Sequence, residues 1–334
     1  MYYKFIFYTS LAMGTMVAIS SYSWMGMWMG LEINLLSIIP LMSNTDNMMT
    51  SEASMKYFIT QALASTILLF SIIIMSINFM YNLQLNLYFS LLLNTALLTK
   101  MGAAPFHFWF PEIMMGLSWI NSTIMLTWQK IAPMILLIYS NKTLIYLSLS
   151  IITCMLISGI MGNNQTNLRK IMAYSSINHI GWMLASLMFM ESIWLFYFIV
   201  YSIITLNITL IFNILNIFHL KQLFMFMNNN FMIKLFFILN FLSLSGLPPF
   251  LGFLPKWLTI QTMINYELMS LTFIMIISTL MTIFFYIQIT YSTMILQMNE
   301  INFMILFKNS FLLMSTNLIS LSGLILMTIM FNFI

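Results

Sequence analysis

The stretch that decides the fold reads GAAPFHFWFPE over residues 102–112, and it recurs as GLPPFLGFLPK over residues 246–256. Both copies have the form G-x-x-P-F-x-x-x-x-P, and chance recurrence in a Phe-rich chain is the alternative. Each copy interrupts a long apolar run, with Lys100 close to the first and Lys256 in the second. Because proline lacks the helical N–H, both stretches predict broken helices. Broken helices that carry charge at matching points of two halves are typical of ion-translocating membrane proteins.

Composition predicts a membrane protein through the whole length of the chain. Hydrophobic residues make up 61% and charged residues 5%, against roughly 25% charged in soluble domains. No polar stretch is longer than a loop, which excludes a dedicated domain for nucleic acid or a soluble substrate. The single cysteine, Cys154, offers neither a disulfide framework nor an iron–sulfur ligand set. Abundant Met (36) and Phe (30), with Arg169 as the lone arginine, favour a mitochondrial gene.

Apolar runs long enough to cross a membrane recur along the chain. A spanning helix needs about 20 mostly apolar residues, and the sequence predicts an all-α integral membrane protein with about eleven such helices. Most basic residues fall at the N-terminal side of this arrangement, and Lys142 falls on the other. The positive-inside rule then places the N-terminus in the matrix and the C-terminus in the intermembrane space. The predicted spans are 3–22, 25–43, 56–79, 84–104, 117–139, 143–162, 170–189, 193–219, 233–260, 269–294 and 309–333.

The two G-x-x-P-F copies lie five spans apart, which is an odd number. The units that carry them are therefore expected to cross the membrane in opposite directions, as an inverted repeat. Within one polytopic membrane domain, 1–334, we expect a first repeat over 1–140 (spans 1–5) and a second over 141–296 (spans 6–10). The last span, 309–333, is an extra C-terminal helix outside both.

Four charged residues fall at membrane depth, where each costs about 2.5 to 3.5 kcal/mol on insertion scales. Glu32 lies in the middle of span 2, and Lys100, just before the first break, is its natural partner. The alternatives are a purely structural ion pair and a Lys100 that reaches the membrane surface. Lys130 lies three residues before Pro133, and Lys256 follows the second break. Because desolvation disfavours the charged form, such lysines can exchange protons near neutral pH.

Two histidines are further candidates for holding or relaying a proton. His179 falls in the middle of span 7, the inverted-repeat counterpart of span 2, so it corresponds approximately to Glu32. A hydrogen-bonded core histidine is the alternative. His107, inside the first broken motif, could relay protons between Lys100 and Lys130. The sequence has no pair of histidines on one helix that would indicate haem ligation, and it has no nucleotide-binding motif.

Four segments closely resemble the subunit 2 family of NADH:ubiquinone oxidoreductase (complex I), in its mitochondrially encoded, insect-like invertebrate form. This family belongs to the antiporter-like membrane-arm subunits. The resemblance covers essentially the whole chain. It also fits eleven spans, because bacterial members have fourteen helices and animal members lack the first three. The segments are GLEINLL (30–36), KMGAAPFHFWFPE (100–112), WQKIAP (128–133) and LPPFLGFLPKW (247–257).

The resemblance implies roles for five residues. Glu32 and Lys100 match the acid–lysine pair of a first half-channel. Lys130 matches a central lysine, and Lys256 matches the terminal lysine of a second half-channel. His179 falls where family members carry a polar residue between them. In the scheme that follows, a charge change from a neighbouring subunit alters the Glu32–Lys100 pair. Lys100 then repels the proton on Lys130 toward His179 and Lys256, because charges about 4 Å apart interact by about 4 kcal/mol at an effective dielectric of 20.

The implied function is that of a proton-translocating core subunit in the membrane arm of respiratory complex I. Such a subunit couples NADH oxidation and ubiquinone reduction, which occur elsewhere, to proton pumping across the mitochondrial inner membrane. The chain is expected to bind no cofactor or metal, since NADH, FMN, iron–sulfur clusters and ubiquinone are used in other parts of the complex. Its expected partners are other membrane-arm subunits and inner-membrane lipids, with no nucleic acid and no function alone. A free-standing cation/proton antiporter and a purely structural scaffold remain the alternatives.

Overall fold

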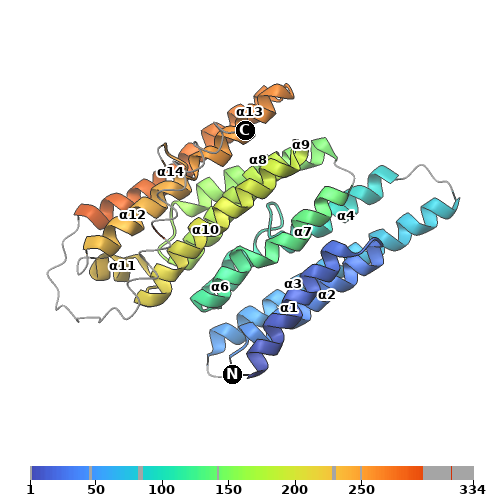
Figure 1. The fold of residues 1–334 in the computed structure, drawn as a ribbon, viewed down its shortest axis with the longest axis horizontal. Helices are drawn as coiled ribbons and strands as arrows, with labels where there is room; N and C mark the ends of the chain where they lie inside the picture. Colours follow the sequence, from blue (N-terminus) through green and yellow to red (C-terminus); the bar gives the residue numbers. More distant parts are fainter. Residues whose placement is uncertain are drawn as a thin grey trace, which may run out of the picture. The chain divides into compact units, whose positions relative to one another are not determined.

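A computed structural model describes residues 2–44, 47–81, 86–140, 143–227, 231–248, 250–295 and 317. These residues form helices joined by short connections, and their strand-like pairing is one isolated bridge between Asn167 and His219 (Figure 1). The predicted all-α class is therefore confirmed. The helices are α1 (Tyr2–Ser20), α2 (Trp24–Met42), α3 (Met48–Tyr81), α4 (Asn86–Met101), α5 (Trp109–Gly116), α6 (Trp119–Leu126), α7 (Trp128–Tyr139), α8 (Leu144–Gly162), α9 (Leu168–Phe189), α10 (Glu191–Leu215), α11 (Leu220–Met227), α12 (Phe231–Ser245), α13 (Phe253–Asn265) and α14 (Met269–Ile295).

The helices follow the apolar runs. Six helical stretches are long and apolar enough to cross a membrane: Trp24–Met42, Met48–Ile77, Trp119–Tyr139, Leu144–Gly162, Glu191–Leu215 and Met269–Ile295. Each predicted span up to residue 294 contains at least one helix. The eleventh span, 309–333, lies outside the described residues except for Asn317, so the count of eleven stays a prediction.

Two short helices depart from the predicted spans, whereas the division of one span agrees with its predicted break. The short helices α5 and α11, eight residues each, fall in stretches that were expected to be connections or span ends. The predicted span 233–260 is two helices, α12 and α13, separated by the second broken motif. The physical reason is that eight residues cannot cross a bilayer. Hydropathy over a window of about 20 residues therefore does not detect such helices.

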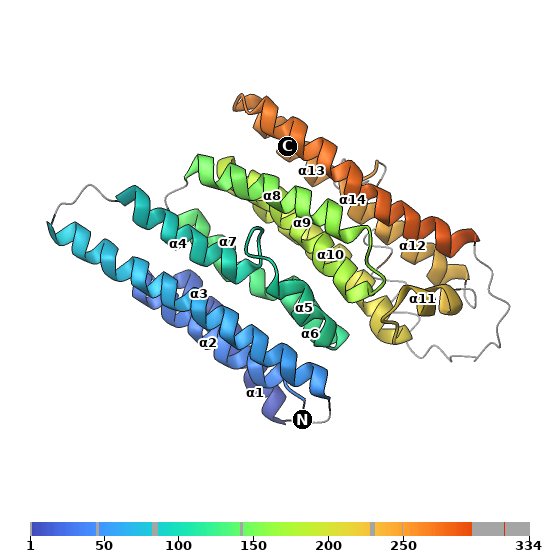
Figure 2. The ribbon, with the colours of Figure 1, turned by 180° about the vertical axis from the view of Figure 1, so that it is seen from behind.

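The chain packs as two compact units, Met1–Cys154 and Met155–Ile334. In the first unit α1, α2 and α3 lie side by side (Figures 1 and 2). Helices α1 and α2 approach closely because Gly30 has no side chain and rests against the backbone of Ala18. Helix α3 also contacts α4 and α5, while α4 contacts α7. This packing brings the first broken motif against α3.

The second unit is built around α9, which is buried along almost its whole length. Helices α10 and α13 contact α9, and α12 contacts both α10 and α14. Helix α9 has polar residues such as Ser175, Ser176, Asn178 and His179 in its interior, and all four are buried. Polar side chains at membrane depth are tolerated where protein rather than lipid surrounds them. The position of α9 thus explains how a comparatively polar sequence can run through an apolar fold.

Candidate functional site

The two broken motifs have the same backbone form. Helix α4 ends at Met101 and is followed by Gly102 with φ of 73°, while α12 ends at Ser245 and is followed by Gly246 with φ of 76°. Non-glycine residues pay roughly 1–2 kcal/mol for such left-handed angles, which explains the glycines. At both breaks a new helix begins seven residues after the glycine.

The hydrogen bonds at the two breaks match as well. The N–H of Gly102 donates to the Thr99 carbonyl (3.2 Å), and the next N–H donates to the Leu98 carbonyl (3.0 Å). The corresponding bonds of the second break run from Gly246 to Ser243 (3.1 Å) and from Leu247 to Leu242 (3.5 Å). This pair of bonds defines the Schellman ending of a helix. The sequence motif thus specifies one local structure in two places.

Lys256 lies in the first turn of α13, directly after the second break. Its ammonium is buried and donates a 2.7 Å hydrogen bond to the carbonyl oxygen of Ser245, the last residue of α12. It also lies 5.9 Å from the centre of the Trp182 ring on α9. Carbonyls at a helix C-terminus lack intrahelical donors and carry partial negative charge, which favours a cation. The break therefore supplies the buried Lys256 ammonium with a polar partner.

His179 belongs to the same unit as Lys256. Its Nδ1 lies 2.9 Å from the hydroxyl of Tyr197 on α10, and its ring centre lies 5.0 Å from that of Tyr201. His179 and Trp182 are three residues apart on α9, which places them on one face of the helix. His179 and Lys256 therefore adjoin neighbouring turns of α9. The structure thus places both sequence candidates of the second unit against one helix.

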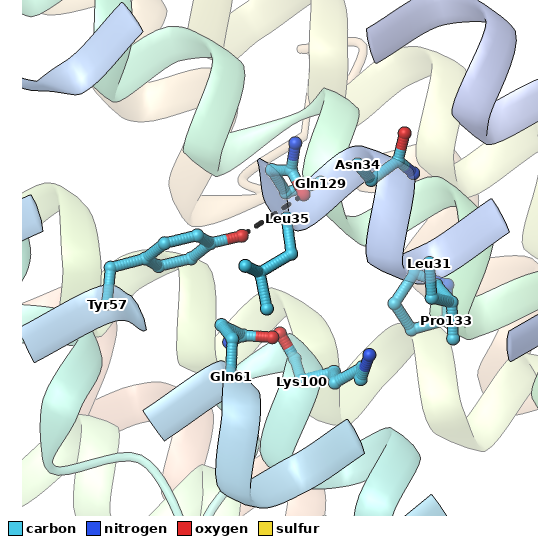
Figure 3. Close-up of a pocket in the computed structure, with 8 residues that line it drawn as sticks. All are labelled: Leu31, Asn34, Leu35, Tyr57, Gln61, Lys100, Gln129 and Pro133. Carbon is cyan, nitrogen blue, oxygen red and sulfur yellow. Dashed lines mark hydrogen bonds between the residues drawn. The ribbon is translucent and has the colours of Figure 1, made fainter. Parts of the chain in front are cut away.

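Lys100 lines a small cavity in the first unit, between α2, α3, α4 and α7 (Figure 3). The volume in which the centre of a water molecule can lie is about 10 Å³. The cavity therefore has room for roughly one water. Around it, the Tyr57 hydroxyl points toward the amide oxygen of Gln129 at 3.4 Å, and the Gln61 amide donates to the Lys100 carbonyl at 3.4 Å. The lining residues are Leu31, Asn34, Leu35, Tyr57, Gln61, Lys100, Gln129 and Pro133.

Glu32 and Lys100 interact electrostatically but do not form a closed ion pair. The carboxylate of Glu32 acts on the Lys100 ammonium through space. In the part of the chain that the structure describes, no ion pair within 4.0 Å joins them. The Glu32 Oε1 atom is buried and has no hydrogen-bond partner among these residues. The ion pair expected from the sequence is thus not closed in this structure.

Lys130 is buried at the start of α7. Its ammonium lies 5.8 Å from the centre of the Phe110 ring on α5. The sequence placed Lys130 beside a kink at Pro133, whereas the structure interrupts the helix at Thr127, between α6 and α7. A proline ring clashes with the carbonyl four residues earlier, here that of Gln129, so the distortion lies upstream of the proline.

His107 is buried in the first break, and its Nδ1 lies 3.3 Å from the carbonyl oxygen of Pro105. Its ring also packs on Phe108, with ring centres 4.5 Å apart. The recorded contacts thus hold His107 to the break, and neither Lys100 nor Lys130 is among them. Its relay role stays a prediction.

Several residues of these sites were not identified from the sequence. Tyr57, Gln61 and Gln129 line the cavity, Tyr197 contacts His179, and Ser245 contributes only its carbonyl. Every residue type has a backbone carbonyl, so the contact made by that of Ser245 cannot be predicted from the residue type. Tyrosine and glutamine are also unremarkable within apolar runs, so nothing in one sequence singles them out.

One exposed ion pair connects α3 to α5, and a second lies within α3. The Lys56 ammonium lies 2.8 Å from Glu52 and 2.9 Å from Glu112. Glu112 occupies in the first broken motif the position that Lys256 occupies in the second.

Within the described residues, no group of three or more His, Cys, Asp or Glu side chains could hold a metal ion.

Comparisons with known proteins agree with this architecture. The model of the NADH:quinone oxidoreductase/Mrp antiporter transmembrane family matches residues 21–282. NADH-ubiquinone oxidoreductase chain 2 of Anopheles gambiae is 50% identical, over 98% of this chain and 97% of the relative. A chain of respiratory complex I from Thermus thermophilus is similar in fold, with a TM-score of 0.81 and 22% identity, over 88% of this chain and 71% of that one. A chain of the Mrp complex from Dietzia gives a TM-score of 0.72 and 17% identity, over 84% and 58%.

Apolar spans, two broken helices of one form and buried lysines beside them define the class as an antiporter-like polytopic membrane protein. The family follows from the relatives and from the matched model. The chain belongs to the NADH:quinone oxidoreductase/Mrp antiporter family and, within it, to the NADH-ubiquinone oxidoreductase chain 2 proteins.

Proposed function

We propose that this chain is a proton-translocating core subunit of the membrane arm of respiratory complex I. The observation that carries the proposal is the burial of Lys100, Lys130 and Lys256, which are 6%, 1% and 7% exposed, each beside a helix discontinuity. Buried ammonium groups are costly and mark ion or proton pathways in membrane proteins. The relatives named NADH-ubiquinone oxidoreductase chain 2 support the assignment.

In the first unit, Glu32 and Lys100 form the switch. Their separation exceeds 4.0 Å in this structure, and a water-sized cavity beside Lys100 leaves room for its ammonium to move. When the pair closes, Glu32 offsets the charge of Lys100. When the pair opens, the positive field of Lys100 acts on Lys130, because both lie in the same low-dielectric unit. The proton on Lys130 is the one displaced.

In the second unit, His179 and Lys256 receive and release the proton. Lys256 holds its proton through the hydrogen bond to the Ser245 carbonyl, so breaking that bond favours release. His179 can take up a proton while its Nδ1 stays engaged with the hydroxyl of Tyr197. His107 is a lesser candidate beside the first break.

The proposal extends to the arrangement of the subunit in its membrane. We place the chain in the mitochondrial inner membrane as about eleven spans, with the N-terminus in the matrix and the C-terminus in the intermembrane space. Residues 1–140 and 141–296 form repeats of opposite orientation, and 309–333 is an extra span. Its partners are other membrane-arm subunits and lipids. As part of an H⁺-translocating NADH:ubiquinone reductase, it leaves NADH, FMN, iron–sulfur clusters and ubiquinone to the rest of the complex.

A second candidate is a free-standing cation/proton antiporter, favoured by the likeness in fold to a chain of the Mrp complex. A structural scaffold is the third, and it predicts that neutralising Glu32 and Lys100 together is tolerated. The three candidate functions differ in whether the chain associates with complex I, and in whether replacing the buried lysines impairs proton pumping. Native electrophoresis of mildly solubilised membranes, with an in-gel NADH dehydrogenase stain and detection of this chain, tests association. Migration away from the stained complex contradicts the proposal and favours the antiporter.

The lysines are tested by Lys130→Met in the assembled complex. We expect near-normal assembly, because methionine is similar in length and apolar, together with a loss of protons pumped per electron. Lys170→Met is the matched control, because Lys170 is only partly buried at the start of α9. A normal proton-to-electron ratio in the Lys130 variant would favour the scaffold.

A further inference from the structure

We propose that Tyr197 is a positioning residue for His179, holding the imidazole so that proton exchange runs through Nε2. This inference rests on the proposed function, and it names a residue to which neither the sequence pattern nor the family resemblance gives a role. The contact that carries it is the 2.9 Å separation of the Tyr197 hydroxyl and His179 Nδ1.

The surroundings make this contact decisive for the orientation of the ring. His179 and Tyr197 are both buried, on the contacting helices α9 and α10. The Tyr201 ring, one turn further along α10, packs on the imidazole with centres 5.0 Å apart. This tilted contact restricts the plane of the imidazole but does not decide which nitrogen faces which way. The hydroxyl of Tyr197 settles that choice, because a buried ring nitrogen needs a hydrogen-bond partner.

A phenol hydroxyl suits a ring that changes its charge. Its oxygen accepts a hydrogen bond from Nδ1–H, which is present both in the neutral Nδ1–H tautomer and in the imidazolium. The same oxygen position therefore serves neutral and protonated imidazole, so the ring keeps its orientation as it gains and loses a proton. Because Nδ1 keeps its proton, the exchanging proton enters and leaves at Nε2, which is bare in the neutral ring and protonated in the charged ring. A carboxylate in the same place would instead favour the charged form.

The orientation of the imidazole matters because Lys256 lies nearby. The Lys256 ammonium lies against Trp182, one turn along α9 from His179. On our scheme these are the two proton-carrying side chains of the second unit. A ring whose exchanging nitrogen is held in one direction transfers protons faster than a ring that must reorient in each cycle.

The test compares Tyr197→Phe with Tyr286→Phe in the assembled complex, each alone and combined with His179→Gln. Tyr286 is the control for losing a buried hydroxyl in the same surroundings, because it is equally buried, lies within electrostatic range of Tyr197, and has ring contacts with Phe241 and Phe285. The measurement is the initial rate of proton uptake into sealed inner-membrane vesicles driven by NADH. Each rate is divided by the amount of assembled complex on a native gel, which removes effects on assembly.

We expect Tyr197→Phe to lower the proton-pumping rate roughly tenfold, since it removes the buried partner of Nδ1, and Tyr286→Phe to stay within about twofold of the wild type. His179→Gln should lower the rate by itself, and adding Tyr197→Phe should cause no further loss, because the tyrosine acts through the histidine. A Tyr197→Phe rate equal to that of Tyr286→Phe, or losses that multiply in the double variant, would overturn the positioning role. Normal pumping in His179→Gln would instead contradict the role of His179 in the proposed function.

Discussion

The ammonium of Lys256 is hydrogen-bonded to the carbonyl oxygen of Ser245, 11 residues earlier in the chain and on the other side of a helix break. Gly246 makes this contact possible. Its left-handed angle, φ of 76°, turns the chain away at the end of α12, and the lysine side chain packs where a Cβ would be. The break and the lysine therefore form one structural unit. The first break has the same glycine but contains no lysine at the matching position.

The first prediction concerns Gly246→Ala. A Cβ at this position would lie 2.7 Å from Cδ and 2.9 Å from Nζ of Lys256, and the left-handed angle adds strain of about 1–2 kcal/mol. We expect the Lys256 ammonium to be displaced from Ser245 and NADH-driven proton pumping to fall several-fold. Gly159→Ala is the control, because its nearest contacts would be 3.0 Å to Met281 Cβ and 3.6 Å to the Ser278 carbonyl, and no left-handed angle is involved. Unchanged pumping in Gly246→Ala would mean that the contact between Lys256 and Ser245 is dispensable.

The breaks and the buried lysines could be predicted from the sequence because proline and glycine have strong local preferences and charges in apolar runs are rare. Those signals depend on residue type, and the matching Schellman endings at Gly102 and Gly246 confirm what they predicted locally. The opposite orientation of the repeats is a statement about the membrane, and it stays a prediction.

The partners of the charged residues could not be predicted in the same way. Gln61 contacts the carbonyl of Lys100, and Tyr197 contacts His179, only because helices far apart in sequence pack together. The interruption at Thr127 was missed for a different reason. A proline is visible in a sequence, but the helix is interrupted six residues earlier, at a place set by the surrounding packing.

The second prediction tests the cavity beside Lys100. Leu35 lines it and is 3% exposed, whereas the next residue, Leu36, is 61% exposed. Leu35→Phe adds volume to a space that holds roughly one water, so we expect it to exclude water and to restrict the Lys100 ammonium. Proton pumping per electron should fall, together with a loss of stability of about 1–3 kcal/mol from overpacking. Leu36→Phe carries the same change on an exposed surface and should leave both unchanged. Equal behaviour of the two variants would show that the cavity has no part in pumping.

The third prediction concerns the exposed ion pairs of Lys56. Glu112→Gln removes one of its two carboxylate partners and leaves Glu52 in place. Exposed pairs contribute roughly 0–1 kcal/mol, so we expect little change in assembly or pumping, although Glu112 lies within the broken motif. The measurement is the proton-to-electron ratio in sealed vesicles, with Glu52→Gln as the control. A large loss in the Glu112 variant alone would show that the first break depends on this carboxylate.

The fourth prediction concerns the attachment of the first break to α8. The Ala104 N–H donates to the sulfur of Cys154 at 3.2 Å, and the Thr153 hydroxyl donates to the Ala104 carbonyl at 3.1 Å. Cys154→Ala leaves a buried N–H without its partner, a loss that costs roughly 1–3 kcal/mol, whereas Cys154→Ser keeps an acceptor there. We therefore expect the alanine variant to shorten the half-life of NADH:ubiquinone activity on warming several-fold, and the serine variant to shorten it less. Thr153→Val and Thr153→Ser provide the same comparison for the carbonyl. If alanine and serine at residue 154 have equal half-lives, the sulfur contributes only its volume, and the loop is held by Thr153 alone.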